Sequence, residues 1–133
     1  MSAFLWSPDF ELGHELMDRT HREFVALVNA LAAASDAELA QRLDDFLTHT
    51  DAHFAQELRW MKSSGFPPLH CHETEHARVL EVAQEVRARA VAGDLEMGRV
   101  LAREIPDWFR DHAATMDAAL AQWLRQTQWA SAA

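Results

Sequence analysis

Two pairs of residues with metal-binding side chains are spaced four positions apart in this 133-residue chain. They are His53 with Glu57, and His72 with His76. In an α-helix four residues turn through about 400°, so the second side chain lies within about 40° of the first and about 6 Å further along the axis. Two side chains of one helix can therefore hold one metal ion between them. A connection with one glycine and two prolines (residues 65–68) separates the pairs, which predicts two antiparallel helices whose ligand faces could meet.

The composition indicates a single globular domain that is mostly helical. Hydrophobic residues make up 49% of the chain, with five Trp and seven Phe, and only four Gly and four Pro occur. The formal net charge of −9 argues against a nucleic-acid partner and against an anionic membrane surface. No run of about 20 apolar residues is present that could span a bilayer.

Cysteine and histidine usage carries further information. The only cysteine is Cys71, so no internal disulfide can form. The first six residues have no basic segment and are too short for a signal peptide, so we expect a cytoplasmic protein. The eight histidines are more than a chain of this size usually carries, and they need an explanation.

Apolar residues recur every three or four positions and predict four helices. Residues 1–16 show no sustained period and are interpreted as an N-terminal arm. Asp18 is the expected N-cap of the first helix, and Ser35 to Glu38 form the capping box of the second. Short links between the helices predict an all-α, up-down-up-down antiparallel four-helix bundle in one domain over residues 1–133. The expected helices cover about residues 18–34, 36–63, 70–92 and 95–129, with a break in the last near 112–117.

Metal-binding residue types interrupt the apolar stripe of every predicted helix. A charged Glu on a core face is costly unless it is paired or bound to a metal. Antiparallel alternation can bring these residues to one level, towards one end of the bundle. Five imidazoles and two carboxylates are too many for one tetrahedral zinc, but they suit two octahedral irons bridged by the carboxylates and a hydroxide, with one open position. The predicted ligands are His21, His53, Glu57, His72, His76, His112 and Asp117.

The spacing within the fourth helix does not fit an ideal α-helix. Asp117 follows His112 by five residues, which is about 140° round the axis. The helix must therefore bulge or end between them, or the two residues must reach different metals. Pro106 removes a hydrogen-bond donor and predicts a kink nearby.

A less specific interpretation exists for each residue taken alone. A single histidine on a core stripe is more often a hydrogen-bonded core residue than a ligand. His14, His49 and His70 lie off the stripes and are interpreted as surface or supporting residues. The convergence of all seven predicted ligands on four stripes is much harder to explain by chance.

The sequence resembles the hemerythrin family, and most closely its single-domain bacterial members. The resemblance covers nearly the whole chain, and the HxxxE, HxxxH and HxxxxD spacings all match. Two departures are small: Leu58 stands where the family often has a second Glu, and Pro106 is not typical. The matching segments are Trp6, Leu12–His14, Asp18–His21, His53–Glu57, Trp60–Met61, Gly65–Pro67, His72–His76, Asp107–His112 and Asp117.

The resemblance implies a non-haem di-iron site that binds O₂ reversibly. By the family pattern, one iron is held by three histidines (His72, His76 and His112) and the other by two (His21 and His53). The two carboxylates and a hydroxide or oxo group bridge the irons, and O₂ binds at the five-coordinate iron with two histidines. Apolar neighbours are expected to exclude water; the candidates are Phe24, Phe54, Trp108 and Phe109.

Three functions remain open from the sequence. The first is oxygen storage, transport or buffering by a protein that is not an enzyme. The second is an oxygen or redox sensor acting on a partner in trans, and the third is a di-iron enzyme that handles peroxide or NO. Zinc competes well for such ligands and could also fill the site. O₂ is the expected partner, and no protein partner can be named from the sequence.

Overall fold

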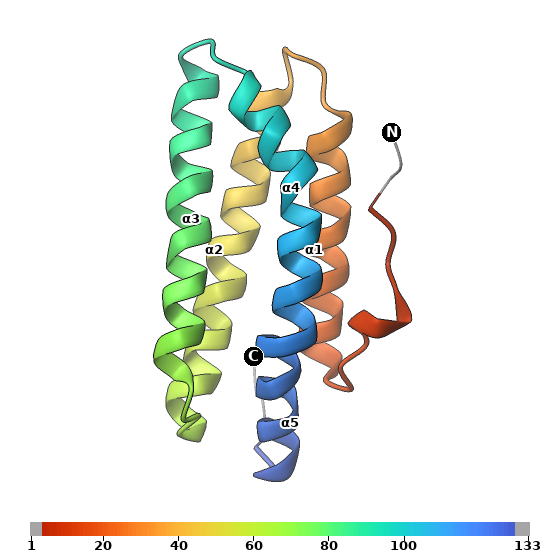
Figure 1. Ribbon diagram of the computed structural model, residues 1–133, viewed down its shortest axis with the longest axis vertical. Helices are drawn as coiled ribbons and strands as arrows, with labels where there is room; N and C mark the ends of the chain where they lie inside the picture. The colour runs from red at the N-terminus through yellow and green to blue at the C-terminus, as the bar shows by residue number, and fades with distance from the viewer. Residues whose placement is uncertain (1–3, 130–133) are drawn as a thin grey trace.

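The computed structural model describes residues 4–129, which form a four-helix bundle, as the sequence predicted (Figure 1). Within these residues there is no β-strand. None of their helices is both long and apolar enough to cross a membrane. The elements are η1 (a 3-10 helix, Pro8–Phe10), α1 (Glu15–Ala33), α2 (Leu39–Ser64), α3 (Leu69–Val91), α4 (Glu96–His112), η2 (a π-helix, Ala113–Asp117) and α5 (Ala118–Gln126).

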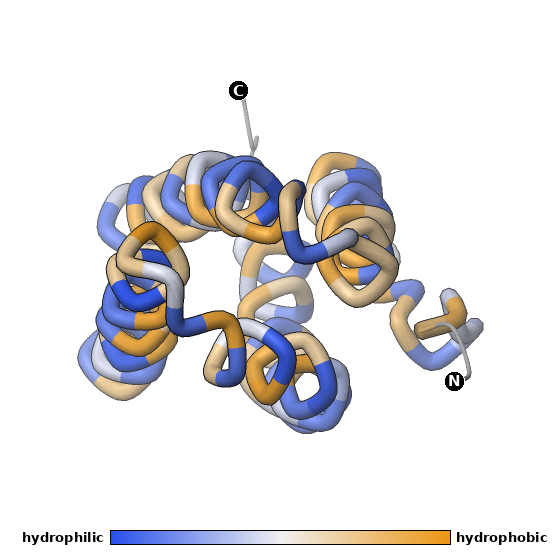
Figure 2. Tube along the Cα trace, turned by 90° about the horizontal axis from the view of Figure 1, so that it is seen from above, coloured by the Kyte–Doolittle hydropathy of each residue, from blue (hydrophilic) through white to orange (hydrophobic). Residues whose placement is uncertain are grey.

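Each of the four long helices packs against two neighbours, so that together they enclose one interior. α1 contacts α2 and α4, and α3 also contacts α2 and α4. Viewed end-on, the helices surround a common interior (Figure 2). Successive helices run in opposite directions, so the connections lie at alternating ends (Figure 1). This arrangement brings one face of every helix to the same axis, which is the condition for a shared site.

The start of α1 differs from the prediction. The helix begins at Glu15 and its N-cap is His14, whose Nδ1 accepts a hydrogen bond from the backbone N–H of Met17 at 3.2 Å. Asp18, the predicted N-cap, lies inside the helix and is buried. Its carboxylate accepts instead from the backbone N–H of Leu12 at 2.9 Å and so ties the arm to the helix.

The start of α2 is also three residues later than predicted. Glu38 reaches back to the backbone N–H of Ser35 at 3.1 Å and to its hydroxyl at 2.9 Å, which is half of the predicted capping box. These contacts stabilise a turn before the helix, which begins at Leu39. Gly65 ends α2 with a left-handed backbone at φ 70°, a conformation that favours glycine.

The N-terminal arm, of which residues 1–3 lie outside the described part, packs along the bundle. The side chain of Asn29 forms two hydrogen bonds of 2.7 Å with the backbone of Phe4. The rings of Phe4 and Phe10 pack edge-on against Phe109, at centroid distances of 5.8 and 5.1 Å. The arm therefore covers the part of α4 that leads into the predicted site.

The buried apolar side chains form two clusters, and the polar site lies between them. The larger cluster fills the end of the bundle where α2 begins, with residues such as Leu31, Leu43 and Phe46. The smaller cluster closes the other end, with Met17, Trp60 and residues of α5. Along α1, for example, Met17 belongs to the smaller cluster and Phe24 to the larger, and the predicted ligand His21 lies between them. The bundle thus shields the site from water on both sides.

Candidate metal centre

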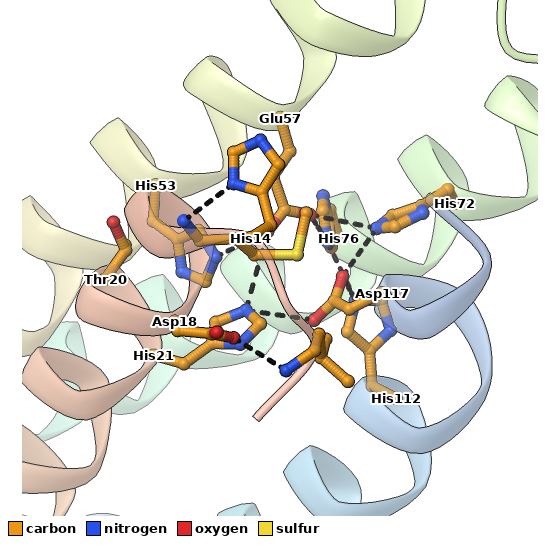
Figure 3. A network of polar contacts seen from close by, with 12 residues as sticks. His14, Asp18, Thr20, His21, His53, Glu57, His72, His76, His112 and Asp117 are labelled. Atoms are coloured by element: carbon orange, nitrogen blue, oxygen red, sulfur yellow. Dashed lines mark hydrogen bonds and ion pairs between the residues drawn. The ribbon is translucent and has the colours of Figure 1, made fainter. Parts of the chain in front are cut away.

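All seven predicted ligands converge in the interior of the bundle (Figure 3). They come from α1, α2, α3 and α4 and from η2, and none of them is more than 5% exposed. Apolar side chains fill the bundle on both sides of this space, yet the sequence places ionisable groups here. Such a concentration of buried polar atoms is stable only when the groups are paired or bind a metal.

The carboxylate of Glu57 faces both sides of the cluster. Its Oε2 lies 2.7 Å from Nε2 of His53 and 3.6 Å from Nε2 of His21. Its Oε1 lies 3.1 Å from Nε2 of His72 and 3.6 Å from Nε2 of His76. One oxygen therefore serves the two histidines of α1 and α2, and the other serves the two histidines of α3.

Asp117 divides its oxygens in the same way. Oδ2 lies 3.1 Å from Nε2 of His21, whereas Oδ1 lies 3.1 Å from Nε2 of both His72 and His112. The Nε2 atoms of His76 and His112 approach to 3.0 Å. The cluster thus has a three-histidine half (His72, His76 and His112) and a two-histidine half (His21 and His53), with both carboxylates between the halves.

The π-helix η2 resolves the spacing problem between His112 and Asp117. A π turn places residue i+5, rather than i+4, above residue i, because its hydrogen bonds run from i to i+5. η2 begins directly after His112 and ends at Asp117, so both side chains point into the bundle. Of the alternatives that the sequence left open, the structure has a bulge between the two residues, and α4 continues through Pro106 without ending there.

Aromatic rings cover the histidines, and they include the four that the sequence suggested. Phe54 stacks on His76 with centroids 3.7 Å apart, and Trp108 stacks on His112 at 4.6 Å. Phe109 meets His21 edge-on at 5.2 Å. Phe24 stacks on Phe109 at 5.0 Å and lies edge-on to His53 at 6.4 Å.

Glu75 is a site residue that sequence reasoning missed. Its Oε1 accepts hydrogen bonds from Nδ1 of His112 at 3.1 Å and from Nε1 of Trp108 at 2.9 Å. The only signal in the sequence is an acidic residue directly before His76, and α3 carries other acidic residues that stay at the surface. The partners of Glu75 lie on α4, more than 30 residues away, so local pattern could not identify them.

The electrostatics of the cluster show mutual compensation. Burial would lower the pKa of His21 and of His72, but the two carboxylates outweigh it and raise these pKa values to about 10 and about 9. Burial lowers the pKa of His76 to about 3, because Glu57 offsets only part of the effect. Burial would raise the pKa of Glu57, but His53 and His21 hold it well below its usual value. The carboxylates are thus ionised and need positive charge beside them.

The donor set fits metal ions at this position. Nε2 of His21 and both oxygens of Asp117 are buried without a hydrogen bond of normal geometry. The shortest distance between the two side chains is 3.1 Å, from Nε2 of His21 to Oδ2 of Asp117. Ligand atoms of Glu57 together with the three-histidine half and Asp117 lie within 4.8 Å of one another, and so do those of Glu57 with the two-histidine half. Imidazole nitrogens with carboxylates are a usual ligand set for iron.

The three remaining histidines lie outside the cluster, as predicted, and so does the cysteine. The ring of His14 lies 4.8 Å from that of Trp60, and His49 contacts the carboxylate of Glu23 at 3.2 Å. His70 and Cys71 are exposed on α3. His14 therefore has a structural role at the start of α1, which the sequence did not reveal.

Comparisons with known proteins agree with this site. The family model described as the hemerythrin HHE cation-binding domain matches residues 12–124. A bacteriohemerythrin of Ralstonia nicotianae is 45% identical over 126 residues, which is 95% of this chain and 92% of that protein. The chain belongs to the hemerythrin family. A bacteriohemerythrin of Stenotrophomonas maltophilia is 26% identical, over 91% of this chain and 81% of that protein.

Solved hemerythrin structures have the same fold. A crystal structure of a leucine-to-alanine variant of hemerythrin superimposes with a TM-score of 0.85, at 23% identity, over 93% of this chain and 98% of that one. Hemerythrins bind a di-iron centre, and the buried His, Glu and Asp cluster of this chain fits iron ligation.

Proposed function

We propose that this hemerythrin binds O₂ reversibly at a di-iron site formed by the seven converging residues. The three-histidine half would hold one iron, and the two-histidine half would hold the other. Glu57 and Asp117 would bridge the two irons, because each carboxylate has one oxygen directed at each half. The proposed physiological role is oxygen storage, transport or buffering.

The observation that carries the proposal is the unequal number of histidines in the two halves. With the same two carboxylates shared between them, the two-histidine half has one protein ligand fewer, which leaves a position for a small molecule. When bound, a ferrous iron pair can supply the two electrons with which O₂ is held and then released. The open position is expected beside His21 and His53.

The chain itself contributes exclusion of water around this position. Phe24 and Phe109 are each 1% exposed, and they bring ring edges or faces towards the two-histidine half. Water and protons are therefore kept from the bound molecule, which supports release of O₂ as O₂ rather than loss of a reduced product.

The ligand types also favour binding over oxidation chemistry. Ferritin-like di-iron sites are built mainly from glutamates with Glu-x-x-His motifs. Here five imidazoles replace most of the carboxylates, so the ligand set carries less negative charge and stabilises Fe(II) relative to higher oxidation states. The relatives are named bacteriohemerythrins, and homologues of this family are oxygen-binding proteins rather than enzymes.

The test is a visible spectrum of the iron-loaded, anaerobically reduced protein before and after addition of O₂. Charge-transfer bands should appear with O₂ and disappear when O₂ is removed, over several cycles. His70→Ala is the matched control, since His70 is an exposed histidine of α3 outside the cluster, and it should behave like the unaltered chain. Immediate irreversible oxidation would instead favour a redox sensor or an enzyme. The metal content must be measured in the same samples, so that zinc-loaded protein is recognised.

A further inference from the structure

The outer nitrogen of His112 is bound by a carboxylate from the neighbouring helix. Nδ1 of His112 lies 3.1 Å from Oε1 of Glu75, and the imidazole must donate this hydrogen bond because an ionised carboxylate can only accept. With the proton on Nδ1, Nε2 of the same neutral ring has a free lone pair directed towards the cluster. The side chain of Glu75 thereby selects which nitrogen of His112 can bind a metal.

His112 differs in this respect from other histidines of the cluster. Nδ1 of His21, of His53 and of His72 is buried and has no hydrogen-bond partner within the described residues. A carboxylate on the outer nitrogen orients the ring and makes the inner nitrogen a stronger electron donor. Within the described residues, a carboxylate on an outer histidine nitrogen therefore occurs in the three-histidine half and not in the two-histidine half.

Trp108 holds Glu75 in position. Its indole N–H donates to the same Oε1 at 2.9 Å, and its ring stacks on the ring of His112 with an angle of 18° between the planes. The carboxylate, the indole and the imidazole thus constrain one another. Rotation of His112 would break both its contact with Glu75 and its stacking on Trp108.

Glu75 also borders a cavity of about 690 Å³ between α3 and α4, and its side chain is 32% exposed. Water can therefore fill the space left by a smaller side chain at this position without opening the core. Glu104, on the α4 side of the same cavity, is exposed and forms no hydrogen bond or ion pair within residues 4–129. It provides a carboxylate of the same charge without a link to the cluster.

We propose that Glu75 is a positioning residue that fixes His112 as an Nε2 ligand and makes the three-histidine half retain its metal more strongly than the two-histidine half. The proposal rests on the ligand assignment of the proposed function. It assigns to Glu75 no contact with O₂ or with the metal.

The first experiment measures the rate of iron release to a chelator from the loaded protein. Glu75→Ala should release the more tightly held iron about 10–100-fold faster, as expected for loss of an outer-shell partner of a ligand. Glu75→Gln keeps an acceptor oxygen without the charge and should fall between. Glu104→Gln removes the same charge from the same cavity and should match the unaltered chain. Equal release rates for Glu75→Ala and Glu104→Gln would overturn the proposal.

The second experiment is independent of iron chemistry and uses the diamagnetic zinc-loaded protein in solution NMR. In the unaltered chain, Nδ1–H of His112 and Nε1–H of Trp108 should give slowly exchanging, downfield proton signals. Both should move upfield in Glu75→Ala and stay in place in Glu104→Gln. Trp108→Phe retains a ring for stacking but loses the N–H, so its His112 signal should shift less than in Glu75→Ala. Unchanged signals in Glu75→Ala would contradict the inferred hydrogen bonds.

These measurements separate failure of this inference from failure of the proposed function. If the protein binds O₂ reversibly but Glu75→Ala releases iron at the usual rate, only the role of Glu75 is wrong. If the unaltered chain shows no reversible oxygen bands, the proposed function is wrong, while the release rates and NMR signals still decide the role of Glu75.

Discussion

The two halves of the metal centre use the same side-chain types but are supported by different surroundings. In the three-histidine half, two of the three histidines have an aromatic ring stacked on them: Phe54 on His76 at 2° between planes, and Trp108 on His112 at 18°. In the two-histidine half, ring edges meet: Phe109 lies at 87° to His21 and Phe24 at 73° to His53. Only the first half has a carboxylate, that of Glu75, on an outer nitrogen within the described structure.

This difference indicates that the two halves of the site have different roles. Face-to-face stacking and an outer carboxylate fix the imidazole planes and suit an iron whose ligands do not change. Edge-on aromatic contacts leave the two-histidine half surrounded by apolar atoms with one protein ligand fewer. Under the proposed function, the bundle would hold one iron firmly and keep the other accessible to a small apolar molecule such as O₂.

The largest expected effect comes from removing a residue that both halves share. Glu57→Ala deletes the oxygens that face His53 on one side and His72 on the other. The iron content should fall from about two per chain to near zero, because neither half keeps its bridging ligand. Iron analysis after loading and desalting measures this. Glu81→Ala, an exposed carboxylate of α3, is the control, and a Glu57→Ala protein with full iron would contradict the bridge.

The next largest effect should come from breaking the three-histidine half. His76→Ala removes a ligand and the ring on which Phe54 stacks, and it leaves two buried carboxylates with less compensation. Loss of iron and a decrease of roughly 3–5 kcal/mol in the free energy of unfolding are expected. Chemical denaturation together with iron analysis checks both. Unchanged iron content in this variant would count against the ligand assignment.

Removing a ligand from the two-histidine half should abolish reversible oxygen binding without removing all of the iron. His53→Ala leaves His21 as the only histidine there, while His72, His76 and His112 are intact. The protein should retain about one iron per chain, held in the half that keeps all its ligands, and should show no reversible oxygen bands. A His53→Ala protein that still binds O₂ reversibly would place the open position in the other half.

Much of the site could be predicted from the sequence, because helical periodicity alone brings the five histidines and Glu57 to the core. Thr50, His53 and Glu57 follow one another at three and four residues, so they share a helix face whatever the exact ends of α2. The five-residue spacing of His112 and Asp117 likewise showed that an unbroken α-helix could not direct both side chains to one site, and a bulge was one of the alternatives it left open. These inferences depend only on geometry within one helix.

The parts that could not be predicted depend on contacts between distant residues. Asp18 was predicted to be the N-cap of α1, but its carboxylate accepts a hydrogen bond from the backbone N–H of Leu12, and His14 is the N-cap instead. Glu75 was not singled out, because its role depends on the way α4 presents Trp108 and His112 to α3. Neither contact leaves a periodic pattern in the sequence.

Without iron, histidines whose pKa is raised and the histidine whose pKa is lowered should make stability depend on pH in opposite directions. The pKa of His21 is raised to about 10 and that of His72 to about 9, so their contribution to stability is complete below the unfolded value of 6.5 and is lost as the pH rises towards 10. The pKa of His76 is lowered to about 3, so it destabilises the fold as the pH falls below 6.5. The iron-free protein should therefore be most stable near pH 6.5.

Thermal unfolding at a series of pH values measures this effect. The melting temperature of the iron-free protein should fall between pH 6.5 and 9.5, whereas the iron-loaded protein should change less, because bound metal replaces the protons as the source of positive charge. A constant or rising melting temperature of the iron-free protein over this range would contradict the charged state assigned to His21 and His72.

The smallest expected effect concerns Thr50, one turn before His53 on the inward face of α2. The residue is fully buried, and its Oγ1 has no hydrogen-bond partner in the described structure, a state that costs about 1–3 kcal/mol. Thr50→Val keeps the β-branched shape and removes the hydroxyl, so it should raise the free energy of unfolding of the iron-free protein by about 1 kcal/mol. If the hydroxyl has no role at the two-histidine half, iron content and the decay rate of the oxygen bands will stay the same. A faster decay in Thr50→Val would instead show that the hydroxyl acts on the oxygen-binding half, which would make that half less apolar than its phenylalanines indicate.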